Sequence, residues 1–210
     1  MDRRESGIHI GTRGWVLPED ASGFYPEDLP EDWMLEYYTT QFHALEIPPL
    51  AEPPDAETVA FWDEETLEDA TLSLSLTGEW GRRLAAGRDP APLARLLEPL
   101  GDKLAVLVWP QKPPTRAAAF WPRTLHLDGT AEILTEARPG PGERAPGAVY
   151  YRLGGPGRYS PESLDRLAEY LVRRGRAGRA NFVFFTAVQG GNAILDAMHL
   201  QEAVEARSRE

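Results

Sequence analysis

Two charged side chains stand between apolar neighbours in segments that have the pattern of buried β-strands. Glu46 lies in Ala44-Leu45-Glu46-Ile47, and Arg152 lies in Ala148-Val149-Tyr150-Tyr151-Arg152-Leu153. Since alternate residues of a strand point to opposite faces, each charge is expected on the face opposite its aliphatic neighbours. A buried carboxylate is costly unless it is paired, and Arg152 is the candidate partner of Glu46. The pair is either a structural ion pair or an acid–base or anion-binding pair, and the two are the weak candidates for catalysis.

Glycine-rich segments follow two late strands. Gly154-Gly155-Pro156-Gly157-Arg158-Tyr159 leads into a helix that Ser160 caps, and Gln189-Gly190-Gly191-Asn192 leads into the last helix. Glycines allow a ligand to approach the backbone, and a helix start offers free N–H groups and a partial positive charge. The segments predict a phosphate or anion site, with tight turns as the plain structural alternative.

Other polar groups follow the expected first and fourth strands. Because functional groups of βα-barrels lie at the carboxyl ends of the strands, these residues are candidate ligand contacts. The full set of predicted contacts is Thr12, Arg13, Trp15, Gln111, Lys112, Arg152, Gly154, Gly155, Tyr159, Gly190 and Gly191.

Neither metal nor nucleophile chemistry has a recognisable motif. His9, His43, His126 and His199 lack the short spacing of a metal site, and cysteine is absent, so no metal and no cofactor are predicted. The sequence leaves open whether the protein is an enzyme. One alternative is a metal-dependent hydrolase or isomerase in which Glu46, His9 and Asp128 converge.

Composition limits the partners. The 210 residues carry a net charge of −11, which opposes the basic footprint that nucleic-acid binding needs. No apolar run reaches the roughly 20 residues of a membrane span, and no secretory signal is visible, so a cytoplasmic location is expected.

The elements that must position these residues alternate between strands and helices, which predicts an α/β fold with parallel strands. Strands are expected near 7–11, 44–47, 71–76, 104–109, 148–153 and 181–185, and helices near 30–42, 55–65, 90–100, 160–174 and 192–207. The strict alternation of leucine and serine at 71–76 predicts a half-buried strand.

In Leu125–Leu134, Asp128-Gly129 separates two alternating stretches, which predicts an antiparallel hairpin. We therefore expect one domain over residues 1–210, a TIM-barrel-like (βα) barrel left incomplete by a β-hairpin around residues 120–137.

The motif Gly11-Thr12-Arg13-Gly14-Trp15, followed by Phe24-Tyr25-Pro26, resembles the opening of the YecE-like family, domain of unknown function 72 (DUF72). The segments Phe42–Ile47, Tyr150–Leu153, Phe182–Phe185 and Gly190–Leu200 extend the resemblance over about residues 7–110 and 147–200. It implies a TIM-barrel-type fold without a firmly established activity.

The chain departs from that family where reactive groups are expected. The resemblance implies a lysine where Ser75-Leu76-Thr77 stands, a histidine at Gly154, and two asparagines at Thr186-Ala187. These departures predict a degenerate member that binds a small anionic or phosphorylated ligand at the carboxyl ends of the strands. A structural or partner-binding protein is the other alternative, a homodimer formed through the region of Trp109, Phe120 and Trp121.

Overall fold

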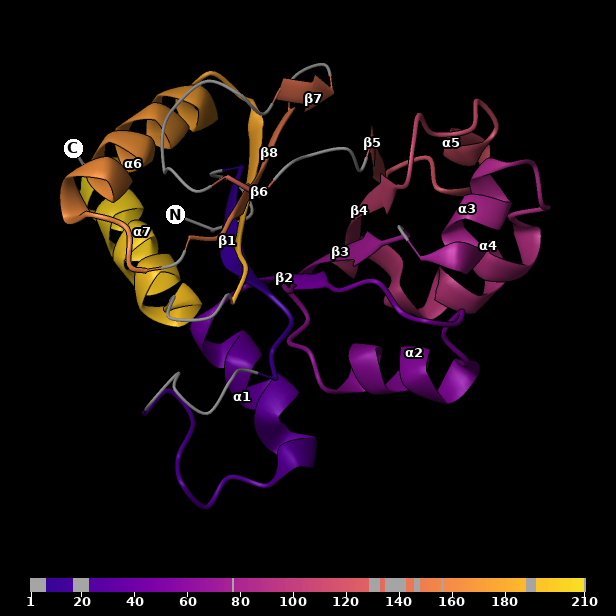
Figure 1. Cartoon of the computed structure of the whole chain (residues 1–210), viewed down its shortest axis with the longest axis horizontal. Coiled ribbons are helices and arrows are strands. Elements are labelled where there is room, and N and C mark those ends of the chain that lie inside the picture. The colour runs from indigo at the N-terminus through magenta and orange to yellow at the C-terminus, as the bar shows by residue number, and fades with distance from the viewer. Residues whose placement is uncertain are drawn as a thin grey trace. The chain divides into compact units, whose positions relative to one another are not determined.

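The computed structural model describes residues 7–16, 23–76, 78–128, 133–134, 143–145, 148–155, 157–187 and 192–209 (Figure 1). The contacts between residues divide the chain into two compact units. The terminal unit comprises Met1–Leu29 and Ala131–Glu210, and the central unit comprises Pro30–Thr130.

The terminal unit is a parallel sheet covered by two long helices. Its strands are ordered β1-β9-β8-β6 with parallel pairing, and β7 pairs with β8 in the antiparallel sense. The helices α6 and α7 lie side by side in Figure 1 and pack against β9 and β1. The elements are β1 (Ile8–Arg13), β6 (Ile133–Leu134), β7 (Glu143–Ala145), β8 (Ala148–Leu153), α6 (Pro161–Arg176), β9 (Ala180–Phe185) and α7 (Ala193–Ser208).

The central unit repeats the alternation of strands and helices. Its four strands are ordered β5-β4-β3-β2 and all pair in parallel. Its strands are β2 (Ala44–Ile47), β3 (Thr71–Ser75), β4 (Leu104–Trp109) and β5 (Leu125–Asp128). Its helices are the 3₁₀ turn η1 (Glu31–Trp33), α1 (Met34–Gln41), α2 (Ala56–Glu64), α3 (Glu79–Ala85), α4 (Ala91–Leu97), the 3₁₀ segment η2 (Glu98–Lys103) and α5 (Ala117–Phe120).

Three helices begin at the capping residues that local sequence predicts. Asp55 accepts a hydrogen bond from the Thr58 N–H at 2.8 Å, and Ser160 accepts one from the Ser163 N–H at 3.3 Å. Asn192 caps α7 in the same way. Each cap satisfies an N–H that the first turn of a helix leaves without an internal partner, so it fixes where the helix starts.

The half-buried character predicted for β3 is wrong, since all five of its residues are buried. Ser73 and Ser75 have no exposed surface. A strand between parallel neighbours is covered on both faces, and the serine face of β3 is therefore an interior face.

The antiparallel hairpin predicted around residues 120–137 is also wrong, because its two segments pair with other strands. Leu125–Asp128 pairs in parallel with β4, and Ile133–Leu134 pairs in parallel with β8. The leucines of β5 are held by the ladder to β4, which outweighs the local turn preference of Asp-Gly. Gly129 itself lies outside the described residues. An antiparallel pairing occurs instead between β7 and β8, where Ala145 faces Ala148.

Two short helices, α3 and α5, have no counterpart in the sequence-based expectations. Among the described helices, none combines the length and apolar character needed to cross a bilayer.

Candidate functional site

One face of the terminal unit's sheet is built mainly from aromatic side chains. The strand register places His9 beside Phe182 and Phe182 beside Tyr150, and two residues further it aligns Gly11, Phe184 and Arg152. The rings of His9 and Phe182 stack with centroids 4.7 Å apart, and those of Tyr150 and Phe184 lie 5.3 Å apart. We call this set the aromatic face: His9, Gly11, Tyr150, Arg152, Phe182 and Phe184.

The opposite face of the same strands packs on the helices. Asn181 of β9 accepts a hydrogen bond from Arg174 Nε of α6 at 3.0 Å. The ring of Phe185 meets that of Tyr159 edge-on, with centroids 5.9 Å apart. The aromatic face is therefore the one that α6 and α7 leave uncovered, as the alternation around Arg152 predicts.

Arg152 is buried on the aromatic face, with 5% of its surface exposed. Its guanidinium carbon lies 5.6 Å from the centre of the Tyr150 ring, which is the geometry of a cation–π contact. Arg13 ends β1 on the side of that strand that carries Gly11, and β9 separates β1 from β8. Arg13 and Arg152 thus lie on β1 and β8, the two strands that flank β9 and its residue Phe184. The residue of β1 aligned with Phe184 is Gly11, which has no side chain.

The carboxyl ends of β1, β8 and β9 meet at one edge because the three strands are parallel. At the end of β1, the Thr12 hydroxyl donates to the Gly14 carbonyl at 2.7 Å, and Gly14 has a φ of +83° that favours glycine. After β9, the Thr186 N–H donates to the Leu153 carbonyl at 2.6 Å. One hydrogen bond thus orders the turn that follows β1, and the other joins the end of β9 to the end of β8.

The predicted contacts of the terminal unit are distributed along this edge. Trp15 follows β1, and its carbonyl accepts a hydrogen bond from the Tyr25 hydroxyl at 2.6 Å. Gly154 and Gly155 follow β8 and are buried. Gly190 and Gly191 lie outside the described residues.

A buried carboxylate that sequence reasoning missed holds the segment after β8. Asp196, in the first turn of α7, has 2% of its surface exposed. It accepts hydrogen bonds from the Tyr159 N–H and from Arg158 Nε, both at 3.2 Å. The Arg158 side chain and the Tyr159 backbone, which precede α6, are thereby fixed to the start of α7. In the sequence, Asp196 is visible only as an acidic residue in the first turn of a helix. Its burial was not predictable, because its partners lie 37 and 38 residues earlier in the chain.

Burial controls the ionisation of this cluster. Loss of hydration raises the pKa of Asp196, and the Tyr159 N–H, Arg158 and His199 oppose that effect. Burial first, and the charge of Asp196 second, raise the pKa of the Tyr159 hydroxyl to about 12, against a hydrogen bond from the Gly154 backbone. Tyr159 is therefore a neutral hydroxyl at physiological pH.

Another polar atom at the same edge was not predicted. The Thr186 hydroxyl oxygen is buried at the end of β9 and has no hydrogen-bond partner among the described residues. It stands where the family resemblance implies an asparagine, so the position keeps a polar group.

The candidates of the central unit are of two kinds. Glu46 is fully buried and its register partner is Ser73, so it lies on the serine face of the sheet. Gln111 and Lys112 follow β4 and are exposed. The pairing of Glu46 with Arg152 stays a prediction.

Three of the histidines each contact one carboxylate or one aromatic ring. His43 and His199 lie 3.1 and 3.4 Å from carboxylate oxygens of Asp69 and Asp165, and His9 stacks on Phe182. Within the described ranges, no three His, Asp or Glu side chains gather in a way that would hold a metal ion. The side chain of Asp128 is outside those ranges.

The tryptophans on which the homodimer hypothesis rests are interior. Trp109 has no exposed surface and Trp121 has 7%. They form a cluster with His126, with ring centroids 6.1 to 6.3 Å apart. Phe120, the third residue of that region, is half-exposed, and the homodimer stays a prediction.

The α/β arrangement has counterparts among solved structures. A DUF72 family protein of Thermotoga maritima matches with a TM-score of 0.61 at 19% identity, over 94% of this chain and 99% of that one. A DUF72 family protein of Enterococcus faecalis V583 matches with a TM-score of 0.59 at 12% identity, over 94% and 95% of the two chains. These likenesses, together with parallel strands that alternate with helices, confirm the predicted fold class, an incomplete α/β barrel of the TIM type.

Sequence comparison gives the family. The model of DUF72, described as a protein of unknown function, matches residues 9–123, which is more than half of the chain. The chain therefore belongs to the DUF72 family, as the opening motif indicated. None of the curated proteins matches it.

Proposed function

We propose that this chain is a binding domain for a small anionic ligand, non-catalytic or weakly catalytic, with its site at the carboxyl ends of β1, β8 and β9. The proposal rests mainly on Arg152, a buried guanidinium above an aromatic ring on a sheet face that the helices leave uncovered. A cation with little water around it attracts an anion more strongly than one at the surface. Arg13 and the backbone at Gly154-Gly155 supply further contacts.

The local charges are compatible with an anion at this edge. Among the described residues of the terminal unit, the buried carboxylate is Asp196, which accepts two hydrogen bonds and is paired with Arg158. The start of α6 adds the partial positive charge of a helix N-terminus, with Ser160 already satisfying one of its N–H groups.

Weak or absent catalysis is supported by the residues at the expected reactive positions. Gly154 follows β8 where the resemblance implies a histidine, and Thr186-Ala187 follows β9 where it implies asparagines. Neither substitution supplies a general base. Tyr159, with its raised pKa, does not supply one at neutral pH either.

A thermal-unfolding titration tests the proposal. Inorganic phosphate and phosphorylated sugars are added to the chain, with potassium chloride at matched ionic strength as the blank. A ligand at about 100 times its Kd stabilises the folded state by about 2.7 kcal/mol, which raises Tm by several degrees.

Arginine variants place the ligand. Arg13→Gln and Arg152→Gln should each reduce the ligand-induced rise in Tm. Arg123→Gln should keep it, because Arg123 is exposed and paired with Asp102 in the central unit. A rise that chloride reproduces, or that survives both Arg13→Gln and Arg152→Gln, contradicts the proposal.

A further inference from the structure

Acidic and basic side chains are segregated along this chain. Residues 14–81 contain 17 Asp and Glu residues and neither Lys nor Arg. The rest of the chain therefore carries all 22 basic side chains against 16 acidic ones. The opposite bias occurs at residues 170–195, which contain four arginines and neither Asp nor Glu. Such segregation points to recognition by charge, because a surface of one sign attracts a partner of the other sign.

The arginines of residues 170–195 lie at the carboxyl end of α6 and in the turn that follows it. Arg173, Arg176 and Arg179 are exposed, and we call these three residues the arginine surface. The guanidinium carbon of Arg173 lies 5.9 Å from the centre of the Tyr170 ring. Arg176 Nη2 donates to the Arg207 carbonyl in the last turn of α7 at 2.9 Å, so the surface reaches the ends of both helices.

The helix ends account for only part of this charge. The partial charges at the carboxyl ends of α6 and α7 together amount to about one negative charge. Glu169 lies 3.7 Å from Arg173, but both side chains are more than two-thirds exposed and solvent screens the pair. The buried Arg174 adds a fourth positive charge beneath the surface. Among the described groups at this end of the two helices, positive charge therefore prevails.

A surface of complementary chemistry lies at η1 and the start of α1. Glu31, Asp32 and Glu36 are exposed, and none of them forms an ion pair with a described residue. Trp33 stands among them with 60% of its surface exposed. We call these four residues the acidic surface. A guanidinium group stacks on an indole ring and pairs with carboxylates, so this surface has the chemistry that binds arginine.

We propose that the arginine surface of one chain binds the acidic surface of a second copy. The charges are opposite, and Trp33 supplies an aromatic anchor for an arginine side chain. Tryptophan and arginine are also the residue types on which interface affinity most often depends. Because the two surfaces differ, the contact is head-to-tail, and it builds either an open row of subunits or a closed ring.

A polyanion such as nucleic acid is the competing occupant of the arginine surface. It would meet three exposed arginines on a chain whose net charge is −11, and that net charge opposes its approach. A second copy brings exposed carboxylates together with Trp33, and it uses both surfaces at once. The charge distribution therefore favours self-association.

Sedimentation velocity over a range of protein concentrations tests the proposal. In about 0.05 M salt the sedimentation coefficient of the wild type should rise with concentration. In about 0.5 M salt it should return to the monomer value, because the screening length becomes about threefold shorter. Trp33→Ala should raise the concentration needed for association about tenfold, as the loss of an interface anchor does.

Two charge-reversed variants identify the surfaces. Arg173→Glu/Arg176→Glu and Asp32→Arg/Glu36→Arg should each be monomeric alone, because each then presents two surfaces of the same sign. An equimolar mixture of the two variants should associate, since the first keeps the acidic surface and the second keeps the arginine surface. Each double reversal changes the charge by four units from −11, so both variants stay net negative and do not attract one another non-specifically.

A matched control reverses two exposed arginines of the central unit. Arg95→Glu/Arg123→Glu should associate as the wild type does. Circular dichroism checks that the variants are folded, and Arg173→Gln/Arg176→Gln, which should also be monomeric, replaces a reversed variant that is not.

Three results would overturn the proposal: a wild type that is monomeric at every concentration, association that both reversals leave unchanged, or a mixture of folded variants that stays monomeric. A monomeric wild type that binds a single-stranded oligonucleotide through Arg173 and Arg176 would also overturn it and assign the arginine surface to nucleic acid.

Discussion

The indole Nε1 of Trp109 donates a hydrogen bond to Nδ1 of His126 at 3.0 Å, and this contact fixes the tautomer of the imidazole. An indole nitrogen only donates, so Nδ1 must be the unprotonated nitrogen and Nε2 must carry the hydrogen. Nε2 then donates to the Trp121 carbonyl at 3.3 Å. His126 therefore joins two buried tryptophans only while it is neutral.

Acid should weaken the fold through His126. Burial lowers the pKa of His126 below its usual value of 6.5, and a hydrogen bond to the Trp121 carbonyl only partly opposes this. The unfolded chain therefore takes up the proton more readily than the folded chain, so the free energy of unfolding falls as the pH drops below about 6.5. Urea unfolding from pH 7.5 to 5 measures the effect.

His126→Asn is the matched variant, because an amide oxygen near the Nδ1 position still accepts from Trp109 without titrating. The stability of His126→Asn relative to wild type should therefore rise as the pH falls through this range. Parallel pH profiles for the two proteins would show that His126 does not carry the effect.

Gly81 should not tolerate a side chain. An added Cβ at this position in α3 would lie 1.5 Å from the Leu76 carbonyl oxygen, which is a backbone atom and cannot rotate away. Gly81→Ala should therefore lower the free energy of unfolding by about 2 kcal/mol or more, against a gain of about 1 kcal/mol in helix propensity. Gly157→Ala, with nothing within 4 Å of the added Cβ, should stay within about 0.5 kcal/mol of wild type in the same urea titration. Equal stabilities for the two variants would mean that α3 does not approach Leu76 as closely as described.

Local signals predicted most of the elements and their starts. Asp55, Ser160 and Asn192 cap helices because a capping bond reaches only three residues along the chain. The same reliance on local signals misplaced the hairpin. Asp128-Gly129 favours a tight turn, but the pairing of Leu125–Asp128 is decided by β4, which lies well upstream.

In the candidate site, the features set by local sequence were predictable and the tertiary contacts were not. The face on which Arg152 lies follows from strand alternation alone, and the structure agrees with it. Asp196 was missed because what makes it notable is its burial against Arg158 and Tyr159, a tertiary contact with no local pattern. The Trp109–His126 bond, between residues 17 apart, was missed for the same reason.

Removal of the Asp196 carboxylate should loosen the segment after β8. Asp196→Ala leaves the Tyr159 N–H without its acceptor and should cost about 1–3 kcal/mol of stability. Asp196→Asn should cost much less, because it keeps an acceptor and removes a charge that burial disfavours. Arg158 contributes little to this difference, since it is half-exposed and its ion pair is screened by solvent.

The pH dependence separates the charge of Asp196 from its hydrogen bonds. Its raised pKa means that the folded chain holds this proton more tightly than the unfolded chain. The resulting stabilisation is present below about pH 3.8 and is lost as the pH rises through the folded-state pKa. Wild type should therefore gain stability relative to Asp196→Asn between pH 7 and pH 4, as measured by urea midpoints. A relative loss over that interval would reverse the sign and contradict the raised pKa.

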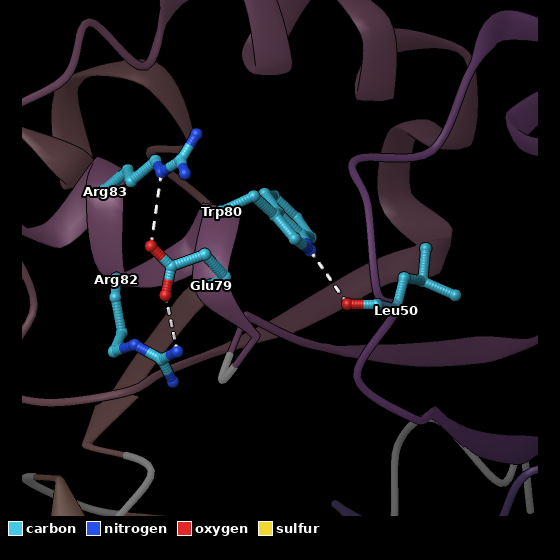
Figure 2. A network of polar contacts seen from close by, with 5 residues as sticks. All are labelled: Leu50, Glu79, Trp80, Arg82 and Arg83. Atoms are coloured by element: carbon cyan, nitrogen blue, oxygen red, sulfur yellow. Dashed lines mark hydrogen bonds and ion pairs between the residues drawn. The ribbon is translucent and has the colours of Figure 1, made fainter.

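Neighbouring residues of α3 should differ sharply in their effect on stability. Figure 2 shows Trp80 donating to the Leu50 carbonyl, at 3.2 Å, while Glu79 binds Arg82 and Arg83. Trp80 is 6% exposed, so Trp80→Phe leaves unfilled space and removes the donor to a partly buried carbonyl, and it should cost about 1–3 kcal/mol. Glu79→Gln should leave the urea midpoint unchanged in 0.15 M salt, because both of its ion pairs are exposed and screened. If Glu79→Gln destabilised the chain as much as Trp80→Phe, the start of α3 would depend on its surface charges, and the contact with Leu50 would not be what joins α3 to the segment after β2.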